Sequence, residues 1–216
     1  MLTHEQARVL GALMEKQVTT PDAYPLTLNA LTTACNQSSN RDPVVRYEPT
    51  LVETSVLNHK AQGLARVVHP GMGERSTKYR QVAHESLHLE PDELAIICVL
   101  LLRGAQTVGE LRTRTERMHA FPTTTAVEEV LQKLAGREEP LVQRLERRVG
   151  QKEDRWTQLL EDDPYLGPED GGGGSSPLAA ASSAAGAARD ERIAELEGRV
   201  EALELAVARL REALGD

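Results

Sequence analysis

The spacing of apolar residues predicts a group of three helices that occurs twice along the chain. In the first copy, Thr3 and Gln6 have the spacing of a capping box, which begins an amphipathic helix. A short helix over 27–35 follows. The third helix begins at Pro49 and ends near Gly63. These three helices can bury one common apolar face.

The second copy has the same order. Pro91 begins a strongly apolar helix that ends at Gly104, and Thr107 caps a short second helix. A third helix is predicted over 123–136 from its apolar stripe. Because the order of the helices is repeated, the pattern indicates two tandem domains of one kind.

Each third helix is followed by alternating positions that predict a β-hairpin. The first hairpin pairs 64–68 with 77–82 around the turn PGMGER, and the second pairs 141–145 with 155–159. Three helices and a terminal hairpin form a winged helix, a relative of the helix-turn-helix. The predicted fold class is therefore mainly α with small β-hairpin wings, in two tandem winged-helix domains that precede a C-terminal coiled-coil helix.

The C-terminal part has a different composition. Residues 165–189 are rich in Gly, Ser and Ala and have no hydrophobic period, which predicts a flexible linker. In residues 190–216 the apolar positions alternate at spacings of three and four, which predicts a coiled-coil helix and a parallel homodimer. The alternative is a lone amphipathic helix that docks on the body. The predicted dimerisation residues are Ile193, Leu196, Val200, Leu203, Val207, Leu210 and Leu214.

Charge is distributed unevenly over the 216 residues, whose net charge is −8. The first predicted domain, 1–84, holds nine Lys and Arg against seven Asp and Glu and is the only net-positive part. The second predicted domain, 85–164, holds eleven Lys and Arg against sixteen Asp and Glu. Because this domain is net negative, we expect it to bind a protein partner. Only 3% of the residues are aromatic, which argues against a single-strand binder that stacks bases on aromatic side chains. Any binding of DNA must therefore use a local basic region of the first domain.

The candidate DNA contacts lie in the first domain, on its third helix, in the loop before that helix and on the wing. Cations on a wing neutralise phosphates, and Gly71 and Gly73 let the turn approach the backbone closely. Thr and Asn can read base edges, whereas Glu48 and Glu53 repel phosphate. The alternative is that the wing charges only keep the hairpin tip solvated. The candidates are Arg41, Arg46, Thr50, Thr54, Asn58, Lys60, Arg75, Lys78 and Arg80.

Signs of catalysis are absent from the sequence. It contains no Gly-rich phosphate loop and no Gly-x-Ser-x-Gly elbow, so we expect neither an enzyme nor a cofactor. His84 and His88 have a helical metal-ligand spacing without a third ligand nearby, so we expect no metal site. Cys35 and Cys98 indicate neither a disulfide nor a zinc site. Without a signal peptide or a long apolar run, we expect a cytoplasmic protein that does not enter a membrane.

Three stretches carry a resemblance to a known family: EKQVTTPDAYPLTLNALTTACNQSSNRDPV over 15–44, GMGERSTKYR over 71–80 and LLLRGAQTVGELRTRTERM over 100–118. On these stretches, residues 1 to about 160 resemble the YceH-like family of bacterial proteins, which have a tandem winged-helix architecture and no established biochemical role. The linker and the heptads lie outside this resemblance. It implies a fold and, through the fold, DNA binding or regulation, and it implies no catalytic residue.

Together these observations favour a dimeric protein that binds double-stranded DNA through the first winged helix and its wing, as a transcriptional regulator. The alternative is a protein-interaction scaffold, in which paired winged helices hold partner chains and never meet DNA.

Overall fold

The computed structural model describes residues 1–71, 76–146, 153–162 and 164. All of them belong to one compact unit, Met1–Asp170. The predicted linker, the predicted coiled-coil helix with its seven dimerisation residues, and Arg75 lie outside the described residues. The expectations for these parts therefore stay predictions.

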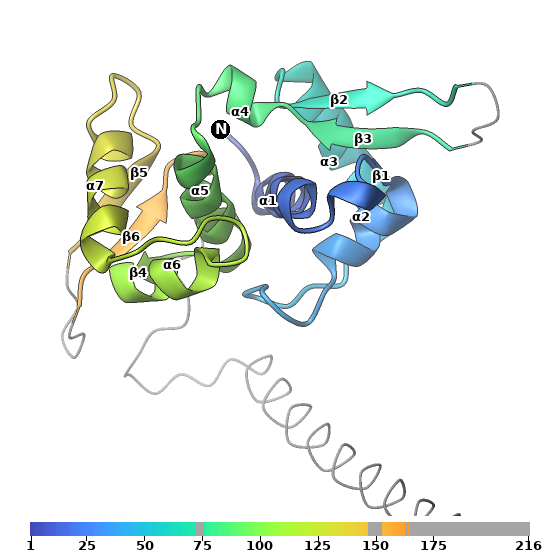
Figure 1. The fold of residues 1–216 in the computed structure, drawn as a ribbon. Helices are drawn as coiled ribbons and strands as arrows, with labels where there is room; N and C mark the ends of the chain where they lie inside the picture. The colour runs from blue at the N-terminus through green and yellow to red at the C-terminus, as the bar shows by residue number, and fades with distance from the viewer. Residues whose placement is uncertain (72–75, 147–152, 163, 165–216) are drawn as a thin grey trace, which may run out of the picture. The chain divides into compact units, whose positions relative to one another are not determined.

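The described chain consists of helices and short antiparallel strands in an order that occurs twice (Figure 1). We call each of the two sets a module. The first module contains α1 (His4–Thr19), β1 (Leu26–Thr27), α2 (Leu28–Cys35), α3 (Pro49–Ala61), β2 (Ala65–Val68) and β3 (Lys78–Gln81), with a 3-10 turn η1 (Pro21–Ala23) after α1. The short α4 (Ala83–Ser86) follows it. The second module contains α5 (Pro91–Arg103), β4 (Gln106–Thr107), α6 (Val108–Thr115), α7 (Thr124–Ala135), β5 (Val142–Leu145) and β6 (Arg155–Gln158).

Local capping begins the helices where the sequence predicts. In α1, Thr3 Oγ1 accepts from the Gln6 backbone N–H at 3.3 Å, and Gln6 Oε1 accepts from the Thr3 N–H at 3.1 Å. Thr107 and Glu110 form the same reciprocal pair at the start of α6. Both predicted capping boxes are confirmed, since each satisfies backbone N–H groups that the first turn of a helix leaves unpaired.

Each module has a three-stranded antiparallel sheet where the sequence analysis expected a two-stranded hairpin. The strand orders are β1-β3-β2 and β4-β6-β5. Leu26 of β1 lies opposite Tyr79, and Gln106 of β4 lies opposite Trp156. The extra strands β1 and β4 have two residues each and lie directly before α2 and α6, so they show no periodicity of their own.

Helix α1 joins the two modules. It lies between α5 on one side and α2 and α3 on the other (Figure 1). Its Leu10 and Met14 belong to the core that also contains α5 and α7, whereas Val9 and Leu13 belong to the core of the first module. The apolar stripes of the predicted helices are buried, as Leu13, Leu31, Val56, Leu100 and Leu131 show, and so is Trp156 of β6.

The approach of α1 to α5 depends on a small residue. A Cβ atom added to Gly11 would lie 2.9 Å from Leu102 Cγ and 3.1 Å from Leu101 Cβ. Cys98 Sγ of α5 donates to the Gly11 carbonyl at 3.3 Å. The backbone of α1 at Gly11 therefore packs directly against the side chains of Leu101 and Leu102 of α5.

The beginning of the chain also reaches the second module. The Leu2 N–H donates to the Leu160 carbonyl at 2.7 Å, and the Asp162 N–H donates to the Leu2 carbonyl at 3.4 Å. These bonds form a short parallel bridge between Leu2 and Glu161. The two modules are thus connected by backbone pairing as well as by the shared core.

Candidate nucleic-acid interface

Helix α3 has one buried and one exposed face. Val52, Val56 and His59 are buried, and His59 Nε2 lies 2.8 Å from the Gln6 carbonyl oxygen of α1. The opposite face is open to solvent. All four residues that the sequence analysis selected on α3 are exposed: Thr50, Thr54, Asn58 and Lys60.

The acidic residue on α3 lies beside the hairpin. Tyr79 of β3 donates its hydroxyl to Glu53 Oε1 at 3.4 Å. Burial and the nearby Glu53 carboxylate both raise the pKa of Tyr79. Glu53 therefore has a neutral partner within the fold, but it is exposed and its negative charge still opposes the approach of phosphate. Glu48, immediately before α3, is exposed.

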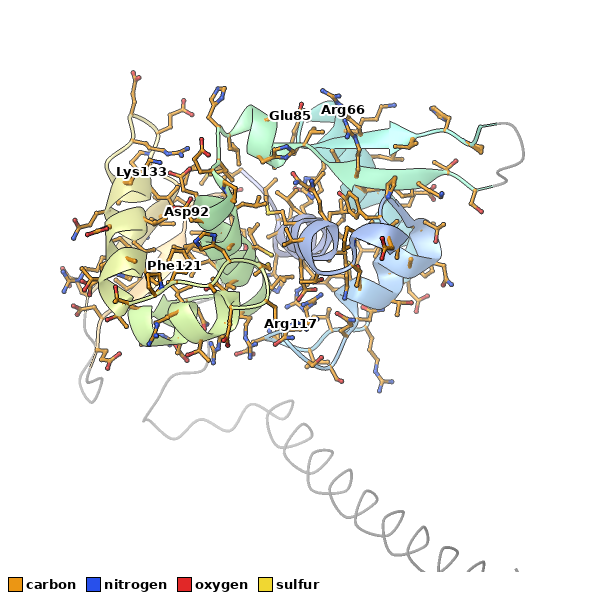
Figure 2. The ribbon with its side chains drawn as sticks, in the orientation of Figure 1. Arg66, Glu85, Asp92, Arg117, Phe121 and Lys133 are labelled. Carbon is orange, nitrogen blue, oxygen red and sulfur yellow. The ribbon has the colours of Figure 1, made fainter. Side chains whose placement is uncertain are left out.

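One face of the sheet β1-β3-β2 carries three cations. Arg66 lies opposite Arg80, and Val68 lies opposite Lys78, so these side chains share a face. Like charges directly opposite each other are unfavourable, and a phosphate between them would relieve the repulsion. Arg66 is paired with Glu85 of α4 at 3.1 Å at the surface (Figure 2). The sequence analysis did not select Arg66, because only the strand register places it beside Arg80.

Arg41 lies inside the protein, which corrects the expectation that it contacts DNA. Its side chain has no exposed surface. Nη2 is 2.6 Å from Glu15 Oε2, Nη1 is 3.2 Å from Glu15 Oε1, and Nε donates to the Ala34 carbonyl at 3.1 Å. Arg41 thus ties the loop before α3 to α1 and α2, because its planar guanidinium fits a carboxylate with two parallel bonds.

The same loop is closed by a second internal pair. Asn36 Nδ2 donates to the Tyr47 carbonyl at 2.9 Å, and the Tyr47 N–H donates to Asn36 Oδ1 at 2.7 Å. Arg46, inside this loop and directly before Tyr47, is exposed. On β3, Lys78 and Arg80 are partly exposed. The described candidates other than Arg41 are therefore on the surface.

The second module differs at the equivalent positions. Counting from the first residue of each helix aligns the buried Val52 with Val127 and places Glu129 of α7 where α3 has Thr54. On the sheet, Gln143 lies opposite Thr157, at the positions of Arg66 and Arg80. Helix α7 therefore carries two carboxylates, Glu128 and Glu129, where α3 carries only Glu53, and the two sheet positions of the second module have no charge.

The described residues give little support to catalysis by a thiol or a metal. Cys35 and Cys98 are free and buried, and burial raises the pKa of the Cys35 thiol to about 12 and that of Cys98 further. A thiol with a raised pKa is a poor nucleophile at neutral pH. No group of three or more His, Cys, Asp or Glu among the described residues could hold a metal ion. His84 Nδ1 instead lies 3.1 Å from Gln81 Nε2.

None of the described helices combines the length and the hydrophobicity that crossing a membrane requires.

Comparison with known proteins gives a family without an assigned activity. The sequence profile described as "Protein of unknown function, DUF480" matches residues 2–151. A UPF0502 protein of Pelobacter propionicus is 46% identical over 216 residues, which cover 100% of this chain and 96% of that protein. A UPF0502 protein of Geotalea daltonii is 48% identical over 196 residues, or 91% of this chain and 87% of the relative.

A UPF0502 protein of Geobacter sulfurreducens is 46% identical over 210 residues, or 97% of this chain and 90% of the relative. The family profile ends at residue 151, in agreement with the extent of the resemblance, while the Pelobacter alignment continues over the whole chain. The resemblance to an uncharacterised bacterial family is confirmed. The chain belongs to the DUF480/UPF0502 family.

Proposed function

We propose that the chain binds double-stranded DNA through its first module and acts as a transcriptional regulator. In this proposal each module is a winged helix. The order of helix, short strand, two helices and two strands supports it, because that order belongs to winged-helix domains. In such a domain the third helix lies in the major groove and the hairpin contacts the DNA backbone.

The observation that carries the proposal is the presence, in one module, of exposed uncharged polar residues on α3 together with a basic sheet face. Thr50, Thr54 and Asn58 are exposed on α3. Lys78 and Arg80 lie on the neighbouring hairpin. Polar uncharged side chains can accept or donate to base edges, and the cations supply attraction to phosphate that does not depend on sequence.

The sharpest test exchanges one residue between the modules. Thr54→Glu gives α3 the carboxylate that α7 has at Glu129. We expect this variant to bind genomic DNA fragments roughly tenfold or more weakly, because the new charge repels phosphate. Glu129→Thr is the matched control and should bind like the natural chain. Both positions are exposed, so melting temperatures should stay unchanged.

A second experiment tests the hairpin. Replacing Arg75, Lys78 and Arg80 with Ala should weaken binding to all fragments. It should also flatten the dependence of binding on salt by about one unit of slope for each lost phosphate contact. The measurement is fluorescence anisotropy over about 50 to 200 mM salt. If the triple variant and Thr54→Glu both bind DNA like the natural chain, the proposed interface on α3 and the hairpin is wrong.

A second candidate function is a protein-interaction scaffold. Leu51 and Leu57 of α3 are 39% and 47% exposed, and Val44 in the preceding loop is 55% exposed. A contiguous exposed apolar patch marks a protein-binding surface, and these three side chains are the candidates for one in the first module. Absence of binding to any fragment at low salt would support this function over DNA binding.

Dimerisation through residues 190–216 belongs to the same proposal and rests on the heptad spacing of the sequence. Two linked first modules would raise avidity for two DNA half-sites through effective concentration.

A further inference from the structure

A cavity of about 270 Å³ lies between the two modules. The end of α1 and the loop before α3 form one side, and α5 with the end of α6 forms the other. Its basic lining comes from Arg103, Arg114 and Arg117, and its apolar lining from Val99, Leu102 and Met118. Figure 2 shows Arg117 beyond the end of α6, on the side that faces the first module.

Internal partners account for some of these charges. Arg114 Nη2 is 3.0 Å from Glu110 Oε1. Glu15, which also lines the cavity, is held by Arg41 at 2.6 Å. Neither residue therefore needs a ligand to balance its charge.

Arg103 is satisfied less completely. Its Nη1 donates to the neutral Asn40 Oδ1 at 3.1 Å, while its Nε is buried and has no hydrogen-bond partner among the described residues. Burial, and next the nearby Arg114 charge, lower the pKa of Arg103, while the carboxylates of Asp42 and Glu110 act in the opposite direction. An oxyanion in the cavity would accept from the Nη groups of this guanidinium and favour its charged form.

Arg117 adds a second cation at the rim. It is exposed, so its side chain can turn toward the cavity without breaking internal packing. The exposed Glu116 also lines the cavity. The apolar residues form the rest of the wall, and such a mixture is typical of sites for small organic molecules. The volume is close to the lower end of such sites, roughly 300 to 1,000 Å³.

We propose that this cavity binds a small organic anion, whose carboxylate or phosphate is held by Arg103 and Arg117 and whose apolar part lies against Val99, Leu102 and Met118. Arginine suits this task because its planar donors match both oxyanions. The first module contributes Thr19 and Asn40 to the lining, so a ligand that also touches them would stabilise the association of the two modules. This inference does not depend on DNA binding, and its test contains no DNA.

The experiment uses the full chain with three probes: inorganic phosphate, phenyl phosphate and benzoate. Chloride keeps the ionic strength constant, which separates site binding from general screening. We expect a saturable rise in melting temperature with at least one of the two aromatic probes, and weaker binding of inorganic phosphate, which lacks an apolar part. The comparison of phenyl phosphate with benzoate shows which oxyanion the site prefers.

The position of the bound probe is read by NMR from the ¹³C-methyl group of Met118. Its chemical shift should change with the same saturation curve as the melting temperature. Arg103→Gln and Arg117→Gln should each weaken binding at least tenfold. Because Arg117 is exposed, its variant keeps the test valid if Arg103→Gln unfolds the chain. Arg144→Gln, an exposed arginine outside this cavity, is the charge-matched control and should bind like the natural chain.

Three results would overturn the proposal. The first is no saturable response to any of the probes. The second is a Met118 signal that stays still while the melting temperature rises. The third is Arg117→Gln binding as tightly as Arg144→Gln.

Discussion

Arg41→Met distinguishes an internal role of this arginine from a DNA contact. In the structure its guanidinium makes two parallel bonds to Glu15 and also donates to the Ala34 carbonyl and Gln37 Oε1. Removing it leaves the Glu15 carboxylate, itself only 10% exposed, without its main partner. Breaking a buried ion pair in this way costs about 3 to 5 kcal/mol.

The lower end of that range applies here, because Lys16 Nζ remains 3.7 Å from Glu15 Oε2. A loss of about 3 kcal/mol shifts the midpoint of urea unfolding by roughly 1 to 3 M. The assay is urea unfolding followed by circular dichroism. Arg46→Met, in the same loop but exposed, is the control and should change stability by less than about 0.5 kcal/mol.

The double variant Glu15→Leu with Arg41→Met supplies a second check. Since it removes both charges, it should recover much of the stability that Arg41→Met loses. An Arg41→Met chain that unfolds at the same urea concentration as the natural chain would refute the internal role.

Two further predictions concern the joint between the modules and the C-terminal part. Gly11→Ala and Gly109→Ala both gain helix propensity, but only the first adds a Cβ within 3.0 Å of Leu102. Gly11→Ala should therefore be the less stable of the two by about 1 to 3 kcal/mol in urea unfolding, and equal stability would contradict the tight α1–α5 approach. Asp at both Val200 and Leu203 should make the chain more monomeric in sedimentation without loss of helix content in residues 1–160. If this variant and a chain ending at Asp163 both stay dimeric, residues 1–163 associate without the predicted coiled-coil helix.

Features that depend on neighbours in the sequence were predictable. The capping pairs join residues three positions apart, and the buried stripes follow the helical period, so Thr3, Gln6 and Leu13 lie as expected. The exposed residues of α3, such as Thr54, follow from the same period because they fall off the buried stripe.

Features that depend on distant partners were not predictable. The partner of Arg41 is Glu15, 26 positions earlier, and composition alone places arginine on the surface. Arg66 joins Arg80 only through the strand register. The cavity beside Arg103 requires α1 to pack on α5, which no local pattern encodes.

The bridge between Leu2 and Glu161 has a consequence for synthesis on the ribosome. Translation proceeds from the N-terminus, so Leu2 emerges long before Leu160, which accepts its hydrogen bond. Leu10 and Met14 of α1 likewise stay uncovered until α5 has been synthesised. The nascent first module therefore exposes part of its hydrophobic surface until the second module has left the exit tunnel. During that interval we expect the unfinished chain to be prone to aggregation.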